Sequence, residues 1–440
     1  MTSGQRASAL SVILTSVALF EGCANFRKLN SDLAFMDSTY IVSAKIENAG
    51  EFPDIYGAVV EWDRGRGKVL SADRARAGSL GLFAFFVKSP RNQHVMAFAD
   101  TNGNQRYDSG EPAWIHSDAA GSAVPADFDP VTRRVRLSGR LSIGVVPPPE
   151  MMAAGNEFRS ERTVEEAATG WAIPIALGDI ADLDDPRFSA VRGEQGLWQP
   201  ASFPRETGVG IYFLEPYDPG RIPVLFVYGA AGSPQDWRVF FGALDRTRYQ
   251  PWFFLYPTGR RLDEVAVVLN NSVELLQSHF GFTRLHVVAH SMGGLVSRSF
   301  LVKNVLEDGN HYVTRFVSIS TPWAGHEAAA MGVKLSPAVV PSWRDLAKGS
   351  DFQKAIQSRR LKGQVDHLLL YGTQRSRSLV LPHENDGTVS VASQLAPAAK
   401  ADAVETIGFD TDHVGILSRT DVIRAVEQFL AGVDRPGARE

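Results

Sequence analysis

The segment Leu285-His286-Val287-Val288-Ala289-His290-Ser291-Met292-Gly293-Gly294 decides the fold of this 440-residue chain. Residues 285–289 predict a buried strand and residues 293–306 predict a helix, so Ser291 stands on the turn between them. Small residues occupy positions 289 and 293, where a large side chain would collide with the neighbouring strand or helix. This turn predicts a nucleophilic serine. Because A-x-S-x-G is common by itself, its partners must come from elsewhere in the chain.

The surrounding sequence alternates between two patterns, one typical of buried strands and one typical of helices. Continuous apolar runs predict strands at 222–228, 252–256, 285–289, 316–320 and 367–371. Helical patterns lie between and after them, at 236–244, 262–280, 293–306 and 421–430. Apolar strands separated by helices predict a mostly parallel sheet covered by helices, an α/β fold, over residues 208–435.

Two residues that follow Ser291 are candidates for an acid and a base. Asp386 lies in Glu384-Asn385-Asp386-Gly387, where Glu384 is a rival carboxylate and a simple Asx turn is the structural alternative. His413 is the one histidine after Asp386 and precedes the helix at 421–430. A carboxylate fixes the tautomer of a histidine, and the histidine then accepts the serine proton.

Four segments resemble the lipase-like α/β-hydrolases. They are Ala289–Gly294, the loop Tyr228-Gly229-Ala230-Ala231-Gly232-Ser233 (with Tyr228 in place of the usual His), Asn385–Val389, and Ser320–Gly325 (with Trp323 in place of His). The resemblance spans residues 208–433. It implies a catalytic triad of Ser291, Asp386 and His413, with the backbone N–H groups of Ala230 and Met292 as the oxyanion hole.

The resemblance further implies hydrolysis of carboxylic esters of lipid-like substrates through an acyl-enzyme, with no metal and no cofactor. Two alternatives stay open: acyl transfer by the same residues, and a non-catalytic cell-surface binding or assembly protein on a hydrolase scaffold. Residues 323–364 lie where lipases carry a cap. Their apolar side chains line an acyl pocket or belong to the core; they are Trp323, Met331, Val339, Val340 and Trp343.

The N-terminus predicts export. Arg6 precedes an apolar run over 7–20, which is short for a membrane span and suits a signal peptide. Gly22-Cys23 resembles the lipobox of bacterial lipoproteins, although Glu21 departs from it. The resemblance implies a signal peptide over 1–22, lipidation of Cys23 as the mature N-terminus, and a membrane-anchored protein of the outer membrane or cell surface. Plain export and a cytoplasmic chain are the alternatives.

Residues 24–39 are interpreted as a tether and residues 40–145 as a small all-β sandwich, because short alternating runs recur at 40–46, 58–62, 82–87 and 94–99. Residues 146–207 are interpreted as a linker or arm. Between the predicted strands, the spacing of Asp100 to Glu111 matches an EF-hand calcium loop, except that Gln105 stands where glycine is expected. An Asn/Gly-rich hairpin explains the same residues.

Composition excludes other classes. The formal net charge is -4 and no basic block is present, so nucleic acid is not an expected partner. The single cysteine, Cys23, excludes an intramolecular disulfide and a cysteine-based zinc site.

Overall fold

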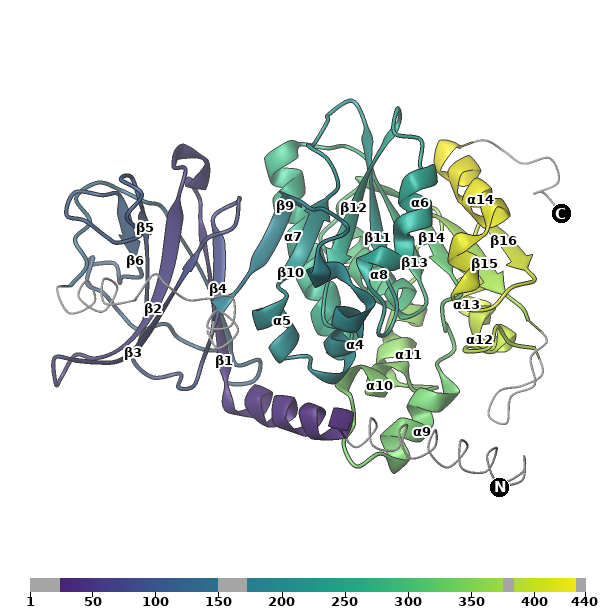
Figure 1. Ribbon diagram of the computed structural model, residues 1–440, viewed down its shortest axis with the longest axis horizontal. Coiled ribbons are helices and arrows are strands. Elements are labelled where there is room, and N and C mark those ends of the chain that lie inside the picture. Colours follow the sequence, from purple (N-terminus) through teal and green to yellow (C-terminus); the bar gives the residue numbers. More distant parts are fainter. Residues whose placement is uncertain (1–23, 149–171, 375–383, 433–440) are drawn as a thin grey trace, which may run out of the picture.

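The computed structural model describes residues 24–148, 172–374 and 384–432. These residues form an all-β unit and an α/β unit that lie side by side (Figure 1). The predicted signal peptide, Cys23 and part of the predicted linker (149–171) lie outside the described residues. Within the described ranges, no helix is long and apolar enough to cross a membrane.

The all-β unit consists of two four-stranded sheets. Their orders are β7-β1-β4-β8 and β3-β2-β5-β6. The two sheets share one core, because successive side chains along a strand point to opposite faces of its sheet. This core contains Val42 and Ala44 of one sheet and Val95 and Ala97 of the other. The strands are β1 (Tyr40–Ile46), β2 (Ile55–Asp63), β3 (Lys68–Arg76), β4 (Leu82–Val87), β5 (Gln93–Ala99), β6 (Ala113–Ile115), β7 (Arg134–Gly139) and β8 (Ala172–Ile173).

The α/β unit is built on one eight-stranded sheet of order β16-β15-β14-β13-β11-β12-β10-β9. Neighbouring strands are parallel except β10 and β12. Its strands are β9 (Ile175–Ile180), β10 (Val209–Phe213), β11 (Ile222–Val227), β12 (Tyr249–Leu255), β13 (Leu285–His290), β14 (Val313–Ile319), β15 (Asp366–Gly372) and β16 (Glu405–Phe409). The five apolar runs predicted as strands are all present, with ends shifted by a few residues.

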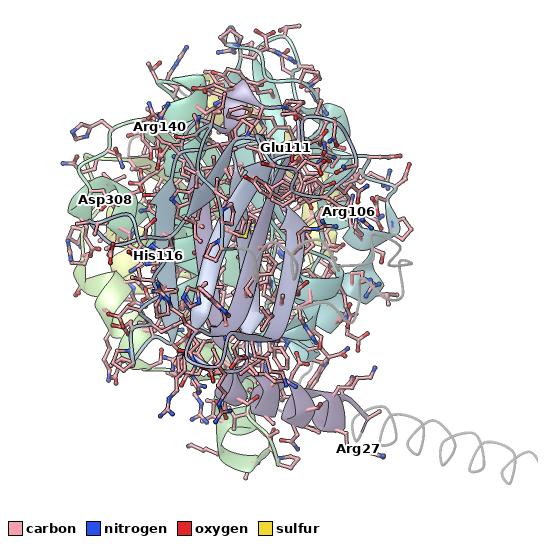
Figure 2. All side chains as sticks on the ribbon, turned by 90° about the vertical axis from the view of Figure 1, so that its left-hand side faces the viewer. Arg27, Arg106, Glu111, His116, Arg140 and Asp308 are labelled. Carbon is pink, nitrogen blue, oxygen red and sulfur yellow. The ribbon has the colours of Figure 1, made fainter. Side chains whose placement is uncertain are left out.

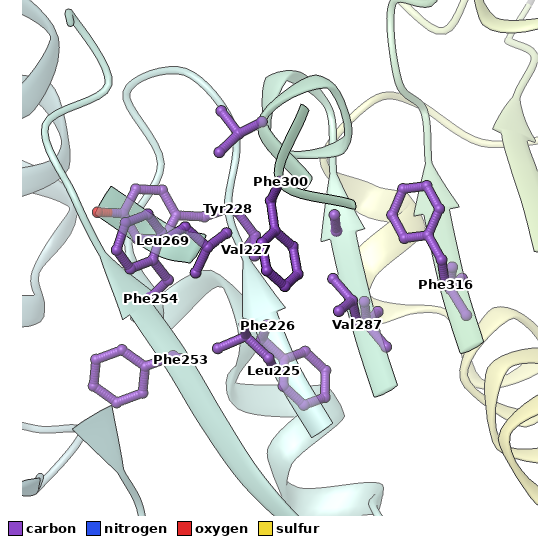
Figure 3. Packing of buried hydrophobic residues seen from close by; sticks show 14 of the residues in the cluster. Leu225, Phe226, Val227, Tyr228, Phe253, Phe254, Leu269, Val287, Phe300 and Phe316 are labelled. Carbon is purple, nitrogen blue, oxygen red and sulfur yellow. The ribbon is translucent and has the colours of Figure 1, made fainter. Parts of the chain in front are cut away.

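Helices cover both faces of this sheet. Phe226 of β11 packs against Phe241 on one face, whereas Leu269 and Phe300 lie beside the strands in Figure 3. The helices are α4 (Ala190–Trp198), α5 (Ser202–Glu206), α6 (Arg238–Ala243), α7 (Leu262–Phe280), α8 (Met292–Leu301), α9 (Glu327–Leu335), α10 (Pro341–Leu346), α11 (Asp351–Ser358), α12 (Val391–Gln394), α13 (Pro397–Asp402) and α14 (Thr420–Ala431). The helix predicted at 293–306 continues past α8 as a π-helical turn over Val302–Glu307.

Residues 24–38 differ from the predicted tether, because they form a helix, drawn purple at the foot of Figure 1. Leu29 is fully buried against Ala338 and Val340 of the α/β unit. The Asp32 carboxylate accepts hydrogen bonds from the Ala201 and Ser202 N–H groups at 2.7 and 2.8 Å. This helix is therefore a packed part of the molecule. Apolar residues at helical spacing account for it.

The predicted linker also differs from the structure. β8 pairs with β4 of the all-β unit, and β9 pairs with β10 of the α/β unit, so one short segment joins both sheets. Helices α4 and α5 follow. Pro174 and Gly178 interrupt the apolar runs in this segment and hide the strand pattern.

Candidate active site

Ser291 occupies a strained turn at the carboxyl end of β13. Its backbone has φ 54° and ψ −129°, a conformation that side-chain-bearing residues rarely adopt. Its N–H donates to the Ile319 carbonyl of β14 at 2.8 Å. A Cβ on Gly293 would lie 2.4 Å from the carbonyl oxygens of Val227 and Tyr228, so only glycine fits there. The small residues around Ser291 therefore serve close backbone packing.

The structure brings Ser291, His413 and Asp386 together. His413 Nε2 lies 2.9 Å from Ser291 Oγ, and His413 Nδ1 lies 2.6 Å from Asp386 Oδ2. All three residues are buried: Ser291 is 9%, His413 7% and Asp386 0% exposed. With the proton on Nδ1 donated to the carboxylate, Nε2 is free to accept the serine proton.

Asp386 is held as an anion. Its Oδ1 accepts the N–H groups of Thr388 and Val389 at 3.0 and 2.7 Å. Burial alone would raise the pKa of Asp386, but the hydrogen bond from His413 and these backbone donors keep the pKa below its ordinary value. The rival Glu384 is exposed to solvent. Of the two carboxylates, Asp386 is the one that contacts the imidazole.

A further histidine positions this group. His290 Nε2 lies 2.8 Å from the His413 carbonyl oxygen and so donates its hydrogen to it. Burial lowers the pKa of His290 to about 3, which keeps the ring neutral. The sequence placed His290 in the turn because it precedes Ser291, but its bond to His413 depends on tertiary structure and carries no local signal.

The loop after β11 approaches Ser291 closely. A Cβ on Gly229 would lie 2.7 Å from Ser291 Cβ. The Ala231 N–H donates to Thr258 Oγ1 at 3.1 Å, whereas no described residue accepts a hydrogen bond from the Ala230 N–H. Met292 begins α8, where backbone N–H groups have no partner inside the helix. Ala230 and Met292 thus offer two N–H groups close to the serine.

Tyr228, which replaces the expected histidine, anchors this loop. Its hydroxyl donates to the Tyr256 carbonyl at 2.7 Å and accepts the Tyr256 N–H at 2.8 Å. The Tyr256 hydroxyl donates in return to the Tyr228 carbonyl at 2.5 Å. The two rings are stacked 4.7 Å apart. This reciprocal pair fixes the backbone immediately before Gly229.

The segment expected to be a cap, 323–364, contains α9, α10 and α11. Trp323 is 1% exposed and packs on Phe316 and His367, and Val340 packs on Leu29, so these two belong to cores and not to an acyl pocket. Apolar character alone does not distinguish a side chain in the core from one that lines a pocket. Glu327, the first residue of α9, accepts a hydrogen bond from the Ser390 hydroxyl at 3.1 Å, four residues after Asp386. Helix α9 therefore begins near the segment that carries Asp386.

The loop from Asp100 to Glu111 closes on itself by hydrogen bonds. Asp100 accepts the Gly103 and Gln105 N–H groups at 2.8 and 2.7 Å, and Gln105 has φ 60° at the expected glycine position. Figure 2 shows Glu111 and Arg106 on the same part of the all-β unit. Among the described residues, no group of three or more His, Cys, Asp or Glu side chains is placed to hold a metal. These hydrogen bonds are those of an Asn/Gly-rich hairpin, the alternative to a calcium loop.

Comparison with known proteins finds one family model and several solved structures that resemble part of this chain. Residues 258–335 match the family model of lecithin:cholesterol acyltransferase. No curated protein matches the chain. The Bacillus licheniformis lipase BlEst2 in mature form is similar at 19% identity over 51% of this chain and 98% of that chain, with a TM-score of 0.38.

Two further structures resemble this chain. The lin2722 gene product of Listeria innocua is 16% identical over 49% of this chain and 96% of its own, with a TM-score of 0.38. Aspergillus fumigatus lipase B is 13% identical over 50% of this chain and 56% of its own, with a TM-score of 0.37. The titles of several structures that this chain resembles name lipases or esterases.

Proposed function

We propose that this protein is a serine hydrolase that cleaves carboxylic esters of lipid-like substrates. The observation that carries the proposal is the hydrogen-bonded chain from Ser291 Oγ through the His413 imidazole to the Asp386 carboxylate. A buried carboxylate, a correctly oriented imidazole and a serine on a strained turn are the parts that acyl transfer to serine needs.

In the proposed reaction, Ser291 Oγ attacks the ester carbonyl while His413 Nε2 takes its proton. The N–H groups of Ala230 and Met292 stabilise the oxyanion, each contributing roughly 3 kcal/mol. The tetrahedral intermediate expels the alcohol, which receives the proton from His413, and an acyl-serine remains. Water then attacks the acyl-serine by the same route and releases the carboxylic acid.

Substitution of the triad tests this proposal by ester hydrolysis. Ser291→Ala is expected to reduce kcat by about 10⁴-fold or more without changing the thermal unfolding midpoint, while Ser299→Ala on the same helix retains activity. Asp386→Asn is expected to cost far more activity than Glu384→Gln. Retention of more than a few per cent of activity by Ser291→Ala, or the reverse order of the two carboxylates, would overturn the assignments.

The lipid-like substrate class is supported by exposed apolar side chains on α9 and beside His413. Met331 and Leu335, one helical turn apart on α9, are 47% and 77% exposed, and Val414, next to His413, is 63% exposed. Exposed apolar side chains favour contact with hydrocarbon chains.

Acyl transfer is the second candidate, and the match of residues 258–335 to the acyltransferase family model favours it. The same triad serves both reactions, because only the acceptor of the acyl group differs. Product analysis with an added long-chain alcohol separates the two. A new ester indicates transfer, and free carboxylic acid alone indicates hydrolysis.

For location, we propose that Cys23 is the lipidated N-terminus of an exported, membrane-anchored protein. The support is the Gly22-Cys23 pair after the apolar run. Changing Cys23 to Ser is expected to release the protein from the membrane fraction. A wild-type protein that is already free of the membrane would contradict this proposal.

A further inference from the structure

A cleft of about 580 Å³ separates the all-β unit from the α/β unit and does not include the triad. One wall is the outer face of the β7-β1-β4 sheet, and the other includes helix α7. A cleft of this size is in the range of small-molecule sites, roughly 300–1,000 Å³.

The apolar part of the cleft follows from strand and helix periodicity. On β1, Val42 and Ala44 point into the core of the all-β unit, whereas Ile41 faces the cleft and is only half-buried. On α7, one stripe of side chains is buried in the sheet core, and a second stripe that includes Val268 and Leu275 lines the cleft. Val268 remains 36% exposed although it lies between the two units.

Positive charge gathers at the same cleft. Arg134 of β7 reaches across to Glu264 of α7 at 2.7 Å, and Arg260 binds the same carboxylate at 2.5 Å. Arg136, two residues along β7, is exposed and makes no ion pair with any described residue. Burial lowers the pKa of Arg134, and the charges of Arg260 and Arg136 lower it further. Arg134 and Arg260 therefore share the Glu264 carboxylate, and Arg136 has no ion partner among the described residues. A second carboxylate, Glu274, also lines the cleft.

We propose that this cleft binds a long-chain carboxylate, with the hydrocarbon chain between β1 and α7 and the carboxylate on Arg136 and its neighbouring arginines. The guanidinium group of Arg136, which has no ion partner among the described residues, lies at an apolar cleft and complements a single anionic head on an apolar chain. The choice of a carboxylate rests on the proposed function, because ester hydrolysis releases this class of product. The site is separate from Ser291 and accepts the ligand without covalent chemistry.

Binding of palmitate to the full-length Ser291→Ala protein tests the proposal, measured by calorimetry. One saturable site is expected, with octanoate and the uncharged hexadecanol each binding at least tenfold more weakly. Arg136→Glu and Val268→Trp are each expected to raise the palmitate Kd at least tenfold. Arg140→Glu is the matched control, since Arg140 is also exposed but does not line the cleft, and its Kd is expected to change less than twofold.

Absence of saturable binding, or equal affinity in the two cleft variants and the control, would overturn the site. Tighter binding of hexadecyl phosphate than of palmitate would overturn the choice of a carboxylate. If Val268→Trp does not fold, Arg136→Glu decides, because its side chain is at the surface. The binding assay needs no turnover. An inactive enzyme with an intact palmitate site would therefore contradict the hydrolase proposal alone.

Discussion

Arg298, on the helix that follows Ser291, forms a buried ion pair with Asp402 of α13. The guanidinium Nη2 lies 2.5 Å from Asp402 Oδ2, and the two side chains are 2% and 1% exposed. Arg298 also donates to the carbonyl oxygens of Ile356 and Arg359 at 3.1 and 2.6 Å. One side chain thus joins α8 to α13 and to the end of α11.

Arg298→Met is expected to lower the free energy of unfolding by about 3–5 kcal/mol, because it leaves Asp402 buried with less of its charge compensated. Arg359→Met is the matched control. Arg359 is 45% exposed and pairs with Glu307 at 3.4 Å, so about 1 kcal/mol or less is expected. Urea denaturation measures both, and equal losses would refute the structural role given to Arg298.

Tyr228→Phe tests the anchoring of the loop that carries Ala230. The variant loses the hydroxyl that bonds both the N–H and the carbonyl of Tyr256, so the loop is expected to shift and kcat/KM to fall at least tenfold. Tyr249→Phe removes a hydroxyl that is buried without a hydrogen-bond partner among the described residues. Its activity should stay unchanged. A Tyr228→Phe enzyme as active as the control would show that the pair does not position the loop.

The length of the acyl chain tests the substrate class. Values of kcat/KM are expected to rise from p-nitrophenyl acetate through butyrate to octanoate, by up to about fourfold per buried methylene. Leu335→Asp should reduce activity on octanoate and palmitate but not on acetate, since Leu335 is exposed on α9. A steady fall from acetate onward would contradict a lipid-like substrate while leaving the triad assignment untouched.

Acid is expected to destabilise the protein below about pH 6.5. Burial lowers the pKa of His286, His290 and His367 to about 3 in the folded protein. Between pH 3 and 6.5 the unfolded chain therefore binds more protons, and stability falls as pH falls, by about 1.4 kcal/mol per pH unit for each histidine. His286→Gln should weaken this dependence of the urea midpoint, and His311→Gln, at an exposed residue, should not. If the urea midpoint depends on pH equally in both variants, the buried histidines are not the cause of the acid destabilisation.

The sequence located the elements with strong periodicity. Helix α7 begins and ends at the predicted residues, and the turn between β13 and α8 carries Ser291 as expected. The resemblance of Asn385–Val389 to a lipase segment predicts Asp386, and His413 follows as the one histidine after it. The structure joins the two side chains, and His413 to Ser291, by hydrogen bonds.

Contacts between distant segments could not be predicted in this way. Residues 24–38, predicted as a tether, form a helix on which Phe26, Leu29 and Leu33 pack in one cluster with Ala338 and Val340. Val340 was a candidate pocket residue, but Leu29 covers it from more than 300 residues away along the chain. The role of His290 likewise depends on a carbonyl 123 positions later. Apolar or polar character predicts burial or bonding, but it does not identify the partner.

Covalent labelling tests the central claim most directly. The full-length protein is treated with a fluorophosphonate, and the modified residue is mapped by peptide mass spectrometry. The account predicts one adduct, on Ser291, with simultaneous loss of ester hydrolysis. It predicts no adduct in the Ser291→Ala variant or in the His413→Ala variant. Undiminished labelling of Ser291→Ala, or an unlabelled wild-type protein that still hydrolyses esters, would contradict it.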